Sequence, residues 1–212
     1  MSPKQLPKHG LYAITDGPRD DLVVAVTQAL AGGARLLQYR DKESPEAQRL
    51  ADVVALRQLC HAHEVPLIIN GDIALAKAAG ADGVHLGRGL EGISEARATL
   101  GSTAIIGVAC GGSLELARSA ADAGASYLSF GAFFPSPTKP WAALAPVDLL
   151  RQSAALGLPR VAIGGITPDN GQSLVDAGAD FLAAISTLFR ATDIRATAER
   201  YASLYSTNRN PD

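Results

Sequence analysis

The sequence predicts a single (β/α)8 barrel, in which a closed ring of parallel strands is surrounded by helices. Two observations favour this fold. Short apolar runs alternate with longer segments of helical spacing, and there are eight of each. A phrase rich in small residues recurs at intervals of two strand and helix units, as AGGARLLQ, AGADGVHLG, AGASYLSFG and AGADFLAAI. An open doubly wound sheet is the alternative, but eight evenly spaced units favour closure of the ring.

The strands are expected in runs of Val, Ile and Leu that are apolar nearly throughout, as strands covered by helices on both faces are. Parallel strands need long crossover connections, and the segments between the runs supply them. In chain order the runs cover residues 11–15, 35–40, 66–70, 83–87, 104–109, 127–131, 160–164 and 181–186.

Helices are expected between the strands because start and stop signals bracket the intervening segments. Ser44 before Pro45, and Thr167 before Pro168, are typical of a helix start. A glycine of the recurring phrase, at position 33, 80, 124 or 178, follows each second helix and favours the left-handed conformation that ends it. The predicted helices cover residues 20–31, 44–63, 73–79, 93–100, 113–123, 146–156, 169–177 and 194–205.

The composition narrows the class of protein. Acidic residues number 21 and basic residues 19, which gives a net charge of −2, so a nucleic-acid-binding surface is not expected. With 47% hydrophobic and 19% charged residues, the chain can bury a large core. No apolar run reaches the roughly 18 residues that span a bilayer, and the N-terminus does not resemble a secretion signal. Cys60 and Cys110 cannot build a disulfide framework.

No linker or change in composition divides the chain. We therefore expect a single domain over residues 1–212, with its core from about residue 10 to residue 205. We expect it to be cytoplasmic and to bind small molecules rather than nucleic acid or a membrane. A homo-oligomer is compatible with the sequence, which does not fix the oligomeric state.

In a barrel of this kind the functional side chains gather where strands end and loops lead into helices. The first motif at such a place is QYRDK, in which Gln38, Arg40 and Lys42 lie on one side of an extended segment. The Arg fork and the Lys charge together suit a diphosphate. The alternative is a solvated strand end, with Arg40 paired to Asp41 or Glu43.

The second motif, FPSPTKP, is a long proline-stiffened loop after strand 6. Ser136, Thr138 and Lys139 place two hydroxyls and an ammonium within four residues, which suits a phosphate clamp. A rigid surface loop is the alternative, but a compact barrel rarely carries a long loop without a function.

The third motif combines Gly164-Gly165 after strand 7 with Ile185-Ser186 at the end of strand 8. Loops at these places often form the phosphate site of a barrel through backbone N–H groups and a helix N-terminus. An ordinary tight turn is the alternative for the Gly-Gly pair.

Four further residues have two interpretations each. Tyr39 and Trp141 are candidates to flank a ring-shaped substrate or simply to pack. His85 is as readily a structural histidine as a catalytic one, and Cys110 is more readily a passive thiol than a nucleophile.

Taken together, the motifs GLYAITD, QYRDK, IIN, GADGVHLG, FFPSPTK, AIGGIT and AAISTLF resemble the thiamine phosphate synthase family in order and spacing, from Gly10 to about Tyr205. The resemblance implies a (β/α)8 fold and an enzyme that joins an aminopyrimidine methyl diphosphate to a thiazole phosphate, releasing diphosphate. It also implies Mg²⁺ and a dissociative step, in which diphosphate leaves before the thiazole nitrogen attacks the pyrimidine cation. Cations and fixed donors favour such a separation of charge.

The resemblance also implies a role for each matching residue. The residues assigned to the pyrimidine diphosphate are Gln38, Arg40, Lys42, Asn70 and Lys139. Those assigned to the thiazole phosphate are Ser136, Thr138, Gly165, Ile185 and Ser186.

The chain departs from the family where Mg²⁺ would bind. The family usually has an Asn-Asp pair after strand 3 and an acidic residue in the loop after strand 4. This chain has Gly71 and Leu90 at the two acidic positions. Asp72 and Glu91 stand one place away and are the carboxylates that can substitute, although Mg²⁺ demands strict octahedral geometry.

A further departure is Ala109, where the family typically has Ser, so one hydroxyl contact to diphosphate is lost. Two functions therefore remain open. One is a synthase with altered metal binding, and the other is a family member that binds a phosphorylated ligand without coupling, as a regulatory module. A thiazole tautomerase-like relative is a lesser alternative, because the histidine typical of that branch after strand 5 is missing.

Overall fold

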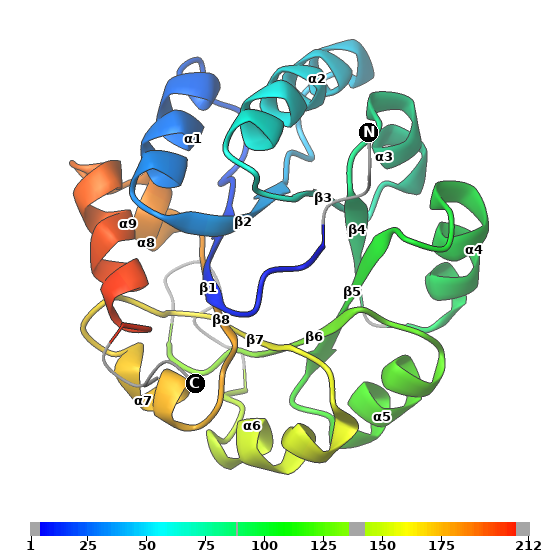
Figure 1. Cartoon of the computed structure of the whole chain (residues 1–212), viewed down its shortest axis with the longest axis vertical. Helices are drawn as coiled ribbons and strands as arrows, with labels where there is room; N and C mark the ends of the chain where they lie inside the picture. The colour runs from blue at the N-terminus through cyan, green and yellow to red at the C-terminus, as the bar shows by residue number, and fades with distance from the viewer. Residues whose placement is uncertain (1–4, 88, 136–142, 207–212) are drawn as a thin grey trace.

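The eight apolar runs form eight parallel strands that close into a barrel, which confirms the predicted fold (Figure 1). In this computed structural model, which describes residues 5–87, 89–135 and 143–206, each strand pairs with the next and β8 returns to β1. The strands are β1 (Gly10–Ile14), β2 (Ala34–Tyr39), β3 (Leu67–Asn70), β4 (Gly83–Leu86), β5 (Ile105–Gly111), β6 (Tyr127–Gly131), β7 (Arg160–Ile163) and β8 (Phe181–Ala184).

The helices form an outer ring around the strands (Figure 1). In the described part of the chain, no helix combines the length and apolar character that a membrane span requires. The helices are α1 (Leu22–Ala31), α2 (Glu46–Ala62), α3 (Ile73–Ala79), α4 (Glu91–Leu100), α5 (Leu114–Asp122), α6 (Asp148–Gln152), the 3₁₀-helix η1 (Ser153–Leu156), α7 (Gln172–Asp176), α8 (Ser186–Phe189) and α9 (Ile194–Ser203).

Most boundaries shift by a few residues from those predicted, and two differences change an element itself. The helix predicted over residues 146–156 divides into α6 and η1, and Gly157 ends it with a φ of 68°. The strand predicted over residues 181–186 ends at Ala184, and Ser186 begins α8 instead. A helix of four residues is too short to show a 3.6-residue period, so the apolar run gave no sign of it.

The recurring glycines end helices as predicted. Those at positions 33, 80, 124 and 178 follow α1, α3, α5 and α7, and their φ angles lie between 65° and 98°. A residue with a side chain is strained in this conformation, which explains why the same small-residue phrase recurs at alternate helix ends.

The hydrophobic core has two parts, one inside the barrel and one between the barrel and its helices. Successive residues of a strand point to opposite faces, so Tyr12 and Leu36 lie inside while Leu11 and Leu37 pack under the helices. Leu6 packs against the interior part of the core. The segment before β1 runs across the end of the barrel at which the strands begin (Figure 1). The other end, where the strands terminate, is the place for a site.

Candidate active site

The end of β1 fixes the backbone at Arg40. Thr15 is fully buried, and its Oγ1 accepts a hydrogen bond from Arg40 N at 2.7 Å while donating to Arg40 O at 3.1 Å. The two strand ends are therefore tied together at the point where β2 leaves the barrel. The Arg40 side chain starts from a backbone position that is set before any ligand binds.

The ion pair proposed as an alternative for Arg40 does not form. The Asp41 carboxylate instead accepts hydrogen bonds from the backbone N–H groups of Glu43 at 2.8 Å and Ser44 at 3.1 Å. Among the described residues, neither Arg40 nor exposed Lys42 forms an ion pair. The mouth of the barrel therefore carries two cations that are available to an anionic ligand.

Tyr39 lies on the outer face of the barrel, between β2 and α2, rather than at the mouth. It is 2% exposed, and its hydroxyl donates to Asp52 Oδ2 at 3.1 Å, with Asp41 Oδ2 at 3.4 Å. Burial, together with the neighbouring Asp52 and Asp41 charges, raises the pKa of the Tyr39 phenol. Strand alternation explains the placement, because Gln38 points inward and its neighbour must point outward. Of the two interpretations of Tyr39, packing fits this position.

The side chain of Gln38 begins a series of hydrogen bonds inside the barrel. Gln38 Nε2 donates to Tyr12 Oη at 2.7 Å, and Tyr12 Oη lies 2.8 Å from Tyr127 Oη. Tyr127 Oη lies 3.0 Å from His85 Nδ1, and the Tyr127 and His85 rings stack with centroids 5.6 Å apart. We call Gln38, Tyr12, Tyr127 and His85 the interior network.

Burial sets the protonation state of the interior network. It raises the pKa of the Tyr12 and Tyr127 phenols above their ordinary value and lowers the pKa of His85 to about 4. Both tyrosines are therefore protonated at neutral pH, and the His85 ring is neutral. The structure thus gives His85 a defined partner.

The two tyrosines escaped the sequence-based search because they lie within apolar strands rather than at strand ends. Alternation along the strand was the available signal, since it places both phenols on the inner face. Gly107 on β5 makes room for this arrangement, because a Cβ there would collide with the ring and hydroxyl of Tyr127.

Asn70 and Ala109 both lie in the carboxyl-terminal halves of their strands. Asn70 is the last residue of β3 and is in register with His85 of β4. Ala109 of β5 is in register with Ser129 of β6. Cys110, the next residue, is buried, and burial raises the pKa of its thiol to about 11, which agrees with a passive thiol.

The loop after β7 is held in shape by Asn170. Its Nδ2 donates to Gly165 O at 3.1 Å, and its Oδ1 accepts from Thr167 N at 2.8 Å. Gly165 has a φ of 62°, and a Cβ there would collide with the carbonyl oxygens of Phe134 and Pro135. Only glycine fits this backbone, which passes directly against the segment that follows β6.

Tyr201 of α9 joins the loop after β7 to the start of α8. Its buried hydroxyl donates to Ile166 O at 2.7 Å and lies 2.9 Å from Thr187 Oγ1. Ile185 and Ser186 open α8, where the first backbone N–H groups have no acceptor within the helix. The Gly165 loop and these N–H groups are thus brought to one side of the mouth, as the third motif predicts.

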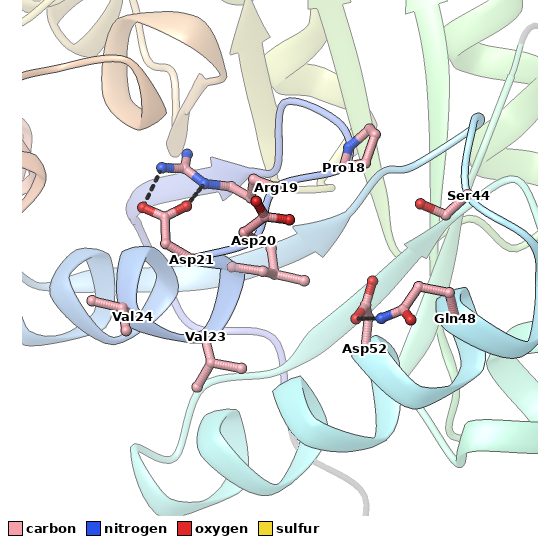
Figure 2. A pocket seen from close by; sticks show the side chains of 10 residues that line it. Pro18, Arg19, Asp20, Asp21, Val23, Val24, Ser44, Gln48 and Asp52 are labelled. Carbon is pink, nitrogen blue, oxygen red and sulfur yellow. Dashed lines mark hydrogen bonds and ion pairs between the residues drawn. The ribbon is translucent and has the colours of Figure 1, made fainter.

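A separate groove of about 490 Å³ lies beside α1 and α2 and includes none of the predicted site residues (Figure 2). Four of its polar side chains are paired with one another. Arg19 Nε lies 2.7 Å from Asp21 Oδ1, and Gln48 Nε2 donates to Asp52 Oδ1 at 2.8 Å. The groove therefore presents few groups that are available to a ligand.

The comparisons with known proteins show the family of the chain. The sequence pattern of one family, described as thiamine monophosphate synthase, matches residues 11–188. The chain belongs to the thiamine monophosphate synthase family. The thiamine-phosphate synthase of Marinobacter nauticus is 51% identical over 197 residues, covering 91% of this chain and 89% of that protein. The thiamine-phosphate synthase of Thiobacillus denitrificans is 52% identical over 200 residues, covering 93% of this chain and 95% of that protein.

A solved structure extends this relationship to the fold. Thiamine phosphate pyrophosphorylase from Pyrococcus furiosus has a TM-score of 0.84 and 33% identity, covering 94% of this chain and 96% of that chain. This member of the thiamine monophosphate synthase family therefore shares its fold with the Pyrococcus furiosus protein along almost the whole chain.

Part of the site predicted from the family resemblance falls in residues 136–142, outside the described residues. This applies to Ser136, Thr138, Lys139 and Trp141. The segments on either side are anchored at the mouth, because Phe134 N donates to Gly164 O at 3.0 Å and Ala145 N donates to Ala132 O at 2.7 Å.

The predicted Mg²⁺ ligand Asp72 has another role in this member of the thiamine monophosphate synthase family. Its Oδ1 accepts from Leu75 N at 2.9 Å and so caps α3, while its Oδ2 lies 3.1 Å from Arg49 Nη1. An adjacent guanidinium repels a divalent cation. Gly71, at the position where the family usually has its carboxylate, adds no ligand.

The second predicted ligand, Glu91, is exposed in the first turn of α4. Residues 5–87, 89–135 and 143–206 contain no group of three His, Cys, Asp or Glu placed to hold a metal ion. Of the two predicted ligands, Asp72 is therefore already paired with Arg49, and the described residues supply no cluster of three such side chains. An Mg²⁺ requirement remains a prediction.

Proposed function

We propose that the chain is a thiamine-phosphate synthase. It joins 4-amino-2-methyl-5-hydroxymethylpyrimidine diphosphate to a thiazole phosphate and releases diphosphate. The observation that carries the proposal is the pair of cations Arg40 and Lys42, at the mouth of a barrel that belongs to the thiamine monophosphate synthase family. Neither forms an ion pair with any residue that the structure describes. Relatives about half identical to this chain are named for this activity.

The first chemical step breaks the bond between the methylene carbon at position 5 of the pyrimidine and the diphosphate oxygen. Negative charge grows on the diphosphate, and the bonding electron pair leaves with it. Arg40 offers two parallel N–H donors to phosphate oxygens, and Lys42 offers a compact charge. Thr15 fixes the backbone of residue 40, so reorganisation at this position as the charge develops is confined to the Arg40 side chain. The family resemblance assigns Lys139 to the same diphosphate.

The second step forms a bond from the thiazole nitrogen to the methylene carbon at position 5 of the pyrimidine cation. The nitrogen is unprotonated and supplies its own electron pair, so no general base is needed. Gly165 and the first N–H groups of α8, at Ile185 and Ser186, are placed to hold the thiazole phosphate. Gln38 and Asn70 face the pyrimidine from the other side of the mouth.

The competing proposal is a binding module that holds a phosphorylated ligand without coupling. It is motivated by Gly71, Leu90 and Ala109, where the usual polar groups are missing. A cytoplasmic location and a homo-oligomer are further predictions that accompany the synthase proposal.

A coupled assay with both phosphorylated precursors, with and without Mg²⁺, separates the two functions. We expect thiamine phosphate and diphosphate to form in equal amounts. Binding of either precursor by calorimetry, without any product at high protein concentration, would instead support the binding module. Product that forms equally well after chelation of Mg²⁺ would show that protein cations suffice for the leaving diphosphate.

A further inference from the structure

If both tyrosine hydroxyl protons are donated within the interior network, the network has two arrangements. Each tyrosine has one hydroxyl proton, and the neutral His85 ring has one N–H. If Gln38 donates to Tyr12, then Tyr12 donates to Tyr127, and Tyr127 donates to His85 Nδ1. In the opposite arrangement His85 Nδ1 donates to Tyr127, and the Gln38 amide presents its oxygen to Tyr12.

The structure has the first arrangement. The Gln38 amide nitrogen, not its oxygen, lies 2.7 Å from Tyr12 Oη. Within the described residues, no donor contacts Gln38 Oε1. The amide therefore keeps its oxygen and its second N–H for a ligand, side by side on one edge.

This edge matches one half of a 4-aminopyrimidine. The exocyclic amine donates to Oε1, and the adjacent ring nitrogen accepts from the second N–H of Nε2. An oxopyrimidine has an acceptor at the exocyclic position and a ring N–H beside it, so the same edge meets it with the wrong order of donor and acceptor. Mismatched buried polar groups are costly, which makes this kind of pairing a strong basis for selectivity.

We propose that Tyr12, Tyr127 and His85 are positioning residues that fix the Gln38 amide with its oxygen toward the substrate, and so select an aminopyrimidine over the corresponding oxopyrimidine. The inference rests on the proposed function, because it takes Gln38 to face the pyrimidine. The network also favours the first step of the reaction. The amine N–H becomes a stronger donor as the ring gains positive charge, and Oε1 is already oriented to accept it.

Binding measurements test the selectivity without requiring turnover. The probes are the monophosphates of 4-amino- and 4-oxo-2-methyl-5-hydroxymethylpyrimidine, measured by calorimetry against the wild type, Tyr12→Phe and Tyr127→Phe. We expect the wild type to prefer the amino probe by about tenfold or more, since each tenfold corresponds to about one good hydrogen bond. In both variants the preference should fall to about twofold, because the amide can then reverse.

Tyr205→Phe is the matched control, because it removes a phenol hydroxyl from a buried ring outside the interior network. Tyr205→Phe should keep the wild-type preference for the amino probe. The melting temperatures of Tyr12→Phe and Tyr127→Phe should remain close to that of this control. An unchanged preference in Tyr12→Phe and Tyr127→Phe would overturn the inference while leaving the synthase proposal intact. A wild type that binds neither probe would overturn the inference, while the coupled assay decides the synthase proposal separately.

Nitrogen NMR of the wild type tests the direction of the network independently of any variant. The chain has four histidines, and His85→Gln identifies the resonances of His85. We expect a neutral ring with its proton on Nε2 and a bare Nδ1. A proton on Nδ1 would mean that the Gln38 oxygen faces Tyr12, and would overturn the inference.

Discussion

The two sides of the barrel mouth are built by different means. Beside β2 and β3, the groups proposed to contact the substrate are side chains, namely Arg40, Lys42 and Asn70. Beside β7 and β8, they are mainly backbone N–H groups, at Gly165 and at the start of α8. The first side depends on charge and the second on the path of the chain.

The supports differ accordingly. Arg40 needs one local tie, the pair of hydrogen bonds between its backbone and Thr15 Oγ1. The backbone side needs groups from further along the chain, since Asn170 shapes one loop and Tyr201 reaches from α9 to both loops. A site made of backbone N–H groups therefore spreads its sequence requirements over residues that never touch the ligand.

Removing the charge of Arg40 should break the side-chain half of the mouth. We expect Arg40→Ala to lower kcat/KM for the pyrimidine diphosphate by about 10²–10³, as the loss of one preorganised donor does in other enzymes. The effect should fall mainly on kcat, because the charge on the leaving group grows in the transition state. Steady-state kinetics with each substrate varied in turn will measure it.

Arg151→Ala, which removes an exposed arginine of α6, is the control and should leave both constants unchanged. A loss confined to KM for the thiazole phosphate would contradict the assignment of Arg40 to the diphosphate.

Adding a methyl group at Gly165 should break the backbone half. Gly165→Ala places a Cβ against the carbonyl oxygens of Phe134 and Pro135, at a φ of 62°. We expect KM for the thiazole phosphate to rise about tenfold, and the free energy of unfolding to fall by about 1–3 kcal/mol. Gly157→Ala separates backbone strain from steric collision. Gly157 has a similar φ of 68°, but no atom lies within 4 Å of the added Cβ. Equal KM values for these two variants would argue against the phosphate site.

The difference between charged side chains and backbone groups also explains which parts of the fold and the site could be predicted from the sequence. The alternation of apolar runs and helices predicted the barrel, because burial on both faces leaves a clear record in residue type. Arg40 and Lys42 were found because charges at a strand end stand out. Tyr12 and Tyr127 did not stand out, since a tyrosine within an apolar run resembles core until its register is known.

Tyr39 illustrates the same limit from the opposite direction. It lies between Gln38 and Arg40, and its ring suits a substrate pocket, but its direction follows from strand alternation rather than from residue type. Asn170 and Tyr201 could not be recognised from the sequence, because their roles depend on loops brought together only by closure of the barrel.

Asp72 lies beside the side-chain half of the mouth, but its carboxylate caps α3. If capping is its main role, Asp72→Ala should lower the free energy of unfolding by about 1 kcal/mol, whereas Asp72→Asn, which keeps an acceptor for Leu75 N, should lower it much less. Neither change should alter the Mg²⁺ concentration that gives half-maximal activity, because Arg49 lies 3.1 Å from the other carboxylate oxygen and disfavours a cation there. Denaturant unfolding and an Mg²⁺ titration of the two variants measure these quantities separately. A large shift of the Mg²⁺ midpoint in Asp72→Asn, at wild-type stability, would make Asp72 a metal ligand after all, and the side-chain half would then depend on a captured cation as well as on its own two.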